Sequence, residues 1–430
     1  MFDETVTVNN NASYNLSGAD RFQLFFDSVA RKNTGTGSVI RAAVTIAGIF
    51  PEEGIYNIIS QNEAIRFMLR SALLKKWYSP LFRLVQKNTP DDPITIINFH
   101  RGELPEEALQ YALSRDCSLV IGSPVFIDVI YDSDHTQIIF SVNHVLMDHA
   151  GMENLLASFS ETKTMQVTPL KPLRRKFILK RVADAIVATL FVAAISGWNL
   201  KRLNRKPHSG TAAFEKLELT VEETTQTKTL LTNEIKVNAL SFFLGAALHA
   251  LDINEELLAQ VNGNYFVAVP IDRRSAALKN VILSNYLSFI YFHAESGKAK
   301  SVKDISESIS RQMIAQAKRG LPEKFSSLLD VFRFIPAPIY SAFINLPSNG
   351  HSGTFAFSLL TNSRLENLSF LGHPVIDVAH YAPVISPPGL NIVFNEFRGR
   401  LKIILSFDDS RIDRLQAKEL LQTIRRNLLG

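Results

Sequence analysis

The residues of this chain with the clearest potential for chemistry lie in segment 143–151, where His144 is followed four residues later by Asp148. His144 follows an alternating stretch, 136–142, that predicts a half-buried strand, and residues 152–159 have the pattern of a helix with one apolar face. An imidazole titrates near neutral pH and can take a proton from a substrate. This setting predicts that His144 is a general base.

Asp148 lies on the same short turn as His144, where a carboxylate can fix the local backbone or pair with an arginine. The candidate partners are Arg273, Arg274, Arg66 and Arg70. The bare His-x-x-x-Asp pattern is weak evidence, because it occurs again at 373–377, where a proline and two β-branched residues indicate turn and strand. A buried histidine bonded to a backbone carbonyl is therefore the alternative interpretation of His144.

The segment resembles the His-His-x-x-x-Asp-Gly signature of the chloramphenicol acetyltransferase-like superfamily, which includes condensation domains, wax ester synthase/diacylglycerol acyltransferases and alcohol acyltransferases. The resemblance implies that His144 is the catalytic base and that Asp148 is mainly structural. Two positions depart from the signature. Asn143 replaces the first histidine and can still donate and accept hydrogen bonds, whereas His149 replaces a glycine and could crowd the channel or act as a second base.

Further segments resemble elements of the same superfamily, in the order in which its members carry them. They are 79–83, 123–126, 237–248, 267–274, 285–289 and 389–403. The resemblance implies an α/β fold in which two chloramphenicol-acetyltransferase-like α/β sandwich subdomains form a V with a central tunnel. A length of 430 residues also favours two domains. We expect an N-terminal half at 1–165 with the His-x-x-x-Asp motif, a basic and apolar crossover linker at 166–210, and a C-terminal half at 211–430.

The resemblance also implies an acyltransferase that moves an acyl group from a thioester to a hydroxyl or amine group. The co-substrate would be acyl-CoA or the phosphopantetheinyl arm of an acyl carrier protein, the acceptor a hydrophobic small molecule or lipid, and we expect no bound cofactor and no metal. Candidate oxyanion or channel residues are Asn143, His149, Asn285, Thr361 and Asn362. The alternatives are a free-standing condensation-type enzyme that forms an amide, a non-catalytic binding member of the superfamily, and a membrane-associated scaffold.

Segment 171–206 concentrates the basic charge of the chain, with ten Lys or Arg residues and one acidic residue, whereas the whole chain has a net charge of +5. The basic residues flank an apolar run at 185–198, which is shorter than the ~20 residues that span a bilayer. Three interpretations stay open: a helix lying on an anionic membrane surface, a crossover helix buried between the halves, and a site for the phosphates of coenzyme A or a carrier arm. Aromatic residues are not interleaved with the basic ones, so we expect no nucleic-acid partner.

The overall composition is that of a packed globular protein, with 46% hydrophobic and 20% charged residues. A single cysteine, Cys117, excludes a disulfide framework and a cysteine metal site. The first residues are acidic and lack the apolar run of a signal peptide. We therefore expect a cytoplasmic protein, with peripheral contact at the inner face of the membrane through 171–206 as a further hypothesis.

Overall fold

The computed structural model describes most of the chain. The described residues are 8–75, 82–87, 96–102, 104–160, 167, 178–196, 199–206, 208–259, 263–297, 301–336, 339–340, 353–361, 363–366 and 368–430. The predicted Asn362, the basic residues at 171–176 and most of segment 79–83 lie outside these ranges.

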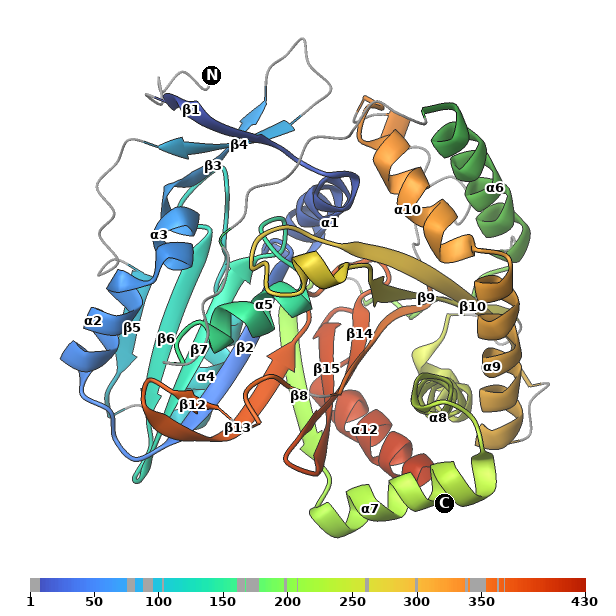
Figure 1. The fold of residues 1–430 in the computed structure, drawn as a ribbon. Coiled ribbons are helices and arrows are strands. Elements are labelled where there is room, and N and C mark those ends of the chain that lie inside the picture. Colours follow the sequence, from blue (N-terminus) through green and yellow to red (C-terminus); the bar gives the residue numbers. More distant parts are fainter. Residues whose placement is uncertain are drawn as a thin grey trace.

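The first of two six-stranded sheets contains the strand that leads to His144 (Figure 1). Its order is β12 (Ser369–Phe370), β13 (His373–Tyr381), β2 (Val39–Ala47), β7 (His135–Asn143), β6 (Val125–Tyr131) and β5 (Ile97–His100). One face packs against α2 (Glu52–Gln61), α3 (Glu63–Arg70) and α5 (His149–Ala157) in a single apolar core. Strand β7 has the predicted position, and α5 begins three residues before the predicted helix.

The second sheet belongs to the C-terminal part of the chain. Its order is β10 (Leu287–Glu295), β9 (Asn264–Asp272), β11 (Phe355–Leu360), β14 (Leu390–Phe397), β15 (Arg400–Asp408) and β8 (Ala212–Glu218). The helices α7 (Val221–Leu230), α8 (Ala239–Ile253), α9 (Val302–Lys318) and α12 (Arg414–Leu429) lie on its outer side (Figure 1). Alternate residues of β14 and β15 point into the core with α8 and α12, as expected for strands whose side chains alternate between faces.

The two sheets meet in a third apolar cluster. Ala43 and Ile139 of the first sheet pack with Phe214, Val393 and Ile404 of the second. Helix α4 (Pro105–Ser114) contributes to the same cluster through small and apolar residues. The fold is therefore the predicted α/β arrangement of two packed subdomains.

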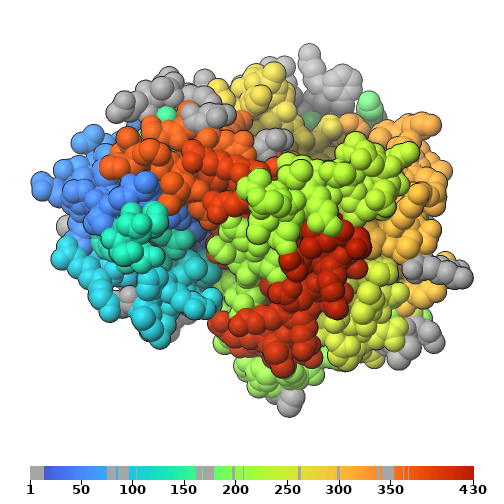
Figure 2. All heavy atoms as spheres, turned by 90° about the horizontal axis from the view of Figure 1, so that it is seen from below, coloured from blue at the N-terminus to red at the C-terminus, as the bar shows by residue number. Residues whose placement is uncertain are grey.

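The chain does not divide simply into an N-terminal half with the first sheet and a C-terminal half with the second. Strands β12 and β13 come after most of the second sheet in sequence, yet β13 pairs with β2 of the first sheet, from Tyr381 opposite Arg41 to Val375 opposite Ile46. In Figure 2 the orange-red atoms of this region lie against the blue N-terminal part. The boundaries at 165 and 210 stay a prediction. The pairing of β13 with the first sheet, here called the excursion of β12 and β13, was not part of that prediction.

The remaining elements lie around these two sheets. A small sheet contains β1 (Val8–Asn15), β4 (Phe82–Lys87) and β3 (Ser71–Lys75). Helix α1 (Gly18–Thr34) follows β1, and α6 (Ile178–Ser196) packs beside α10 (Leu321–Phe332) (Figure 1). Among the described residues, the short helical turns include a π-helix (Leu231–Ile235) and the 3-10 helices Glu255–Leu257 and Ala276–Leu278. Among the described helices, none is both long enough and apolar enough to cross a bilayer.

Candidate active site

Helix α5 begins at the motif because Asp148 caps it. The Asp148 Oδ1 accepts a hydrogen bond of 3.0 Å from the backbone N–H of Gly151, which satisfies one of the free donors of the first turn. Gly151 is required for close packing, because a Cβ there would lie 2.3 Å from the carbonyl oxygen of Ile282. The helix that follows the motif is thus pressed against a segment that lies 131 residues further along the chain.

The imidazole of His144 is oriented by the turn that contains it. Its Nδ1 lies 2.8 Å from the carbonyl oxygen of Met147. A carbonyl can only accept, so Nδ1 carries the proton and Nε2 keeps the basic lone pair of the neutral ring. Burial lowers the pKa of His144 below its ordinary value, and the bond to Met147 opposes that effect only in part. The ring is therefore neutral at physiological pH and has the tautomer that a general base needs.

Asp148 makes the predicted pair with an arginine, and the partner is Arg274. The Arg274 guanidinium binds both carboxylate oxygens, at 2.7 and 2.8 Å, and the backbone N–H of Tyr286 donates to Oδ2 at 2.9 Å. Burial by itself would raise the pKa of Asp148, but Arg274 and the backbone donors hold it below its ordinary value. Arg273 instead pairs with Glu323 at 2.9 Å. Asp148 thus joins the motif to the second half by a buried, bidentate ion pair.

Asn285 forms hydrogen bonds that hold the turn containing His144. Its Nδ2 donates to the carbonyl oxygens of His144 and Val145, at 3.0 and 3.1 Å, and to Asp20 Oδ1 of α1 at 3.0 Å. The preceding residue, Ser284, has a φ of 89° and forms a β-bridge with Met147. The backbone N–H of Ser284 donates to the carbonyl oxygen of Leu146 in the same turn as His144. The structure therefore places Asn285 as a brace of the turn, with its amide hydrogens directed to backbone and carboxylate.

Asn143, which replaces the first histidine of the signature, is also a brace. It is 1% exposed, and its Nδ2 donates to Asp27 Oδ1 at 3.0 Å and to the Cys117 carbonyl at 2.9 Å. Its Oδ1 accepts from the N–H of Val145 at 3.0 Å. Both ends of the amide are used to hold the turn, so the departure from the signature is accommodated by local hydrogen bonds.

His149, which replaces the glycine of the signature, contacts two residues that the sequence did not connect with it. Its ring lies 4.2 Å from that of His380 on β13, edge to face, and Nε2 of His380 lies 2.7 Å from Glu153 Oε1. The pKa of His149 is lowered to about 3, mainly by burial and to a smaller extent by the nearby His380. Burial opposes ionisation of Glu153, but the contacts with His380 and His149 and the Arg364 N–H lower its pKa to about 2. One ligand atom from each of His149, Glu153 and His380 lies within 4.8 Å of the other two.

A cavity of about 1050 Å³ between the two halves contains His144, His149, Glu153 and His380 in its wall. Its wall is largely apolar and includes aromatic side chains from both halves, such as Phe22, Phe26, Phe266, Phe289, Phe332 and Phe355. A volume of this size suits a ligand with an extended apolar part. Of the predicted oxyanion residues, Thr361 lines the cavity, whereas Asn143 and Asn285 are occupied within the turn.

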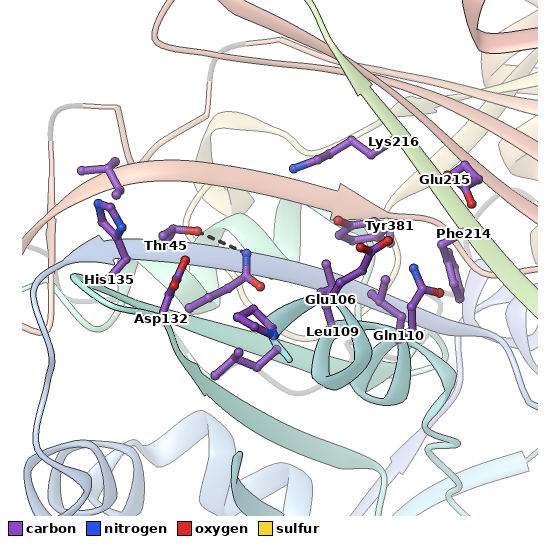
Figure 3. Close-up of a pocket in the computed structure, with 15 residues that line it drawn as sticks. Thr45, Glu106, Leu109, Gln110, Asp132, His135, Phe214, Glu215, Lys216 and Tyr381 are labelled. Atoms are coloured by element: carbon purple, nitrogen blue, oxygen red, sulfur yellow. Dashed lines mark hydrogen bonds between the residues drawn. The ribbon is translucent and has the colours of Figure 1, made fainter. Parts of the chain in front are cut away.

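A second cavity of about 390 Å³ lies where α4 and the first sheet, including β13, meet β8 of the second sheet (Figure 3). Its wall carries charged side chains of both signs, among them Glu106, Asp132, Glu215 and Lys216. None of the motif residues lines it. The larger cavity is therefore the candidate active site.

Comparison with known proteins finds no matching protein-family model and no matching curated protein. Solved structures do match over nearly the whole chain. The first condensation domain of the calcium-dependent antibiotic synthetase is 13% identical, with a TM-score of 0.70 over 98% of this chain and 96% of that one. The chain has the fold of the chloramphenicol acetyltransferase-like superfamily.

Two further solved structures also match nearly the whole chain. A trichothecene 15-O-acetyltransferase from Fusarium sporotrichioides is 12% identical, with a TM-score of 0.68 over 99% of this chain and 97% of that one. Polyketide synthase associated protein 5 from Mycobacterium tuberculosis is 14% identical, with a TM-score of 0.61 over 96% and 98%. The fold expected from the resemblance is confirmed, and at these identities the likeness concerns the fold.

Glu153 and His380, two polar residues of the cavity wall, were not predicted from the sequence. Glu153 follows His149 by four residues, a spacing that places both on one face of a helix and was available as a signal. His380 lies 231 residues beyond His149 and reaches it only because β13 joins the first sheet. No local pattern marks such a contact.

Proposed function

We propose that this protein is an acyltransferase that moves an acyl group from a thioester to a hydroxyl or amine group, with His144 as the general base. The observation that carries the proposal is the state of His144: a neutral imidazole, with Nδ1–H bonded to the Met147 carbonyl, in the wall of the large cavity between the halves. A base held in one tautomer at such a place is suited to take a proton from an acceptor group.

The reaction balances with His144 alone as the proton carrier. Nε2 takes the proton of the acceptor O–H or N–H while the acceptor oxygen or nitrogen attacks the thioester carbonyl carbon. The tetrahedral intermediate then expels the thiolate, which receives the proton from the imidazolium. The Met147 carbonyl accepts from Nδ1–H throughout, so it keeps the ring in place and stabilises its positive charge.

The oxyanion of the intermediate needs a hydrogen-bond donor in the cavity. Thr361 was predicted for this role, and Ser358 of β11 also lines the cavity. Both residues belong to the second half, in β11 and directly after it. We propose Thr361 and Ser358 as the residues to test for this role.

The substrates are proposed from the cavity and from the neighbours. The apolar wall favours a hydrophobic acceptor or acyl chain. The neighbours include both an O-acetyltransferase and domains of peptide synthetases, so the donor is proposed as acyl-CoA or a carrier-bound acyl group, and amide formation of the condensation type is the second candidate.

The test is thiol release from acyl-CoA of graded chain length and from acyl carrier protein, with pooled alcohol, amine and lipid acceptors. His144→Ala is expected to lower acceptor-dependent turnover by about 10²–10⁴-fold, because general-base catalysis supplies about that much. His208→Ala is the matched control, since its side chain is 51% exposed, pairs with Asp409 and lies outside the cavity wall.

Three outcomes are informative. Release that depends on the acceptor and is lost only in His144→Ala supports the proposal. Release that survives in His144→Ala contradicts His144 as the base. A folded wild-type protein that releases no thiol from either donor type contradicts an enzyme and favours the non-catalytic binding alternative.

We also propose that α6 brings the protein to an anionic membrane surface, from which a lipid-like substrate enters the cavity. Its inner face packs on α10 through Ala185 and Ala188, and Val192 lines the cavity. Its outer face exposes Leu179, Ile186 and Leu190, at 88%, 55% and 64%. The exposed face of this helix is apolar, and its first turn contains the exposed Lys180. Both features match the pattern of an interfacial helix.

The basic cluster at 201–206 contributes less to that surface than the sequence indicated. Lys201 is fully buried, lies over the ring of Tyr265 and pairs with Asp252 at 3.5 Å. Lys206 pairs with Asp413 at 3.0 Å. These two side chains attach residues 201–206 to the second half.

Flotation with vesicles that contain anionic phospholipid tests the membrane proposal. Leu190→Glu is expected to weaken binding at least tenfold, whereas Leu415→Glu on α12, where the leucine is 68% exposed, is expected to leave it unchanged. Equal binding by both variants, or no binding by the wild-type protein, contradicts the proposal.

A further inference from the structure

Three side chains of metal-binding type converge in the wall of the large cavity. His149 and Glu153 lie one turn apart on α5, and His380 reaches them from β13. One ligand atom from each residue lies within 4.8 Å of the others, and this is the only such group of three among the described residues. Neither a metal nor this grouping was predicted from the sequence.

The surroundings of Glu153 hold its carboxylate in a fixed orientation. Oε2 accepts from the Arg364 backbone N–H at 2.7 Å and from the Ser363 hydroxyl at 3.1 Å, and Oε1 faces Nε2 of His380 at 2.7 Å. Hydrogen bonds from neighbouring groups to a ligating carboxylate are typical of built metal sites. Here they come from a segment of the second half that is separate from both α5 and β13.

The charge of the group also favours a cation. Glu153 is buried, and the ion pair that it forms is with the imidazole of His380, a group that is positive only when protonated. A buried carboxylate is costly without a compensating charge. A divalent cation between the carboxylate and two neutral imidazoles would supply it.

The donor set indicates which cation. Two imidazoles and one carboxylate are the protein ligands of many zinc sites and of non-haem iron sites, whereas magnesium and calcium prefer oxygen ligands. Three protein ligands leave at least one coordination position for another group. All three residues line the cavity that also contains His144, so that position lies in the space proposed for substrate.

We propose that His149, Glu153 and His380 form a binding site for a first-row divalent transition-metal ion, with zinc as the preferred occupant. The open coordination position would take an oxygen atom of a ligand in the cavity, such as a carbonyl or carboxylate group. The site stands independently of the acyl-transfer proposal, because it is defined by ligand geometry and not by turnover.

The experiment is metal binding by the purified full-length chain after treatment with a chelator. Zn²⁺ affinity is measured by competition with a chromophoric chelator, Co²⁺ binding by its visible absorption, and stoichiometry by elemental analysis. We expect one ion per chain, a rise in the midpoint of thermal unfolding with Zn²⁺ and no such rise with Mg²⁺.

Glu153→Gln and His380→Ala are expected to weaken Zn²⁺ binding at least tenfold, with His208→Ala as the matched control. Since Glu153 and His380 are buried, unfolding of each variant is also measured without metal, and His149→Gln provides a variant at a half-buried position. Wild-type affinity no higher than that of Glu153→Gln, or an unchanged Co²⁺ spectrum in both His149→Gln and His380→Ala, overturns the proposal.

Discussion

Helices α5 and α6 are held in the fold to different extents. Residues 151–157 of α5 are all buried, and the helix is fixed at its start by polar contacts with the second half, above all the pair of Asp148 with Arg274. Helix α6 packs one face on α10 through apolar side chains and through the pair of Arg181 with Asp330, and its other face is exposed. Helix α5, which follows the motif, is therefore enclosed by the fold, whereas helix α6, of which Val192 lines the cavity, is covered on one face.

The largest effect is expected from Arg274→Met, which leaves the buried Asp148 carboxylate without its partner. Breaking a buried pair in this way costs about 3–5 kcal/mol in the free energy of unfolding. Arg273→Met is the control, because Arg273 and its partner Glu323 are 38% and 59% exposed and such a pair contributes about 0–1 kcal/mol. Denaturant titration monitored by circular dichroism measures the free energy of unfolding of both variants. Equal losses would show that the pair of Asp148 with Arg274 contributes no more to stability than an exposed ion pair.

A smaller loss is expected from Gly151→Ala, because the added Cβ would lie 2.3 Å from the Ile282 carbonyl oxygen and 2.8 Å from the Met147 Cβ. Overpacking of this kind costs about 1–3 kcal/mol. Gly54→Ala in α2 is the matched helical glycine, whose nearest obstacle is the side chain of Phe50 at 3.0 Å. If Gly54→Ala is as destabilising as Gly151→Ala, the close approach of α5 to residue 282 is not what limits this position.

The outer face of α6 should tolerate change. Leu190→Ser is expected to alter the free energy of unfolding by no more than about 0.5 kcal/mol, since surface substitutions usually stay within that range. Ala188→Leu on the inner face, where Ala188 is fully buried, is expected to cost about 1–3 kcal/mol. Thermal unfolding of the two variants side by side tests whether α6 is held by one face alone.

The smallest effect concerns pH. Burial lowers the pKa of His144, so its neutral, basic form persists below pH 6.5, where a histidine of ordinary pKa would be half protonated. A pKa of about 6.5 would make acceptor-dependent turnover fall about 1.8-fold between pH 7.5 and pH 6.5, so the expected fall is smaller than that. A midpoint at or above pH 6.5 in the acid limb of kcat/KM would show that the imidazole is less buried during turnover than in the structure.

The sequence predicted what depends on local pattern. The alternation before His144 and the Asp148 cap are encoded within a few residues, and the run of segments in superfamily order was sufficient for the α/β fold of two subdomains. The position of Asn285 was found, but its contacts with Asp20 and the His144 turn were not, since these residues lie more than 130 positions apart. The group of His149, Glu153 and His380 depends on the pairing of β13 with β2, which no periodicity reveals.

The excursion of β12 and β13 has a consequence for how this chain could be divided. A fragment that ended before the second half would leave β2 as a sheet edge from Arg41 to Ile46, with free backbone donors and acceptors and three strands beside it. An exposed edge of this kind pairs readily with other chains. Such a fragment would be expected to self-associate when expressed alone and to recover when residues 211–430 are supplied as a separate polypeptide, since strand complementation in trans would close the sheet and return His380 to the cavity.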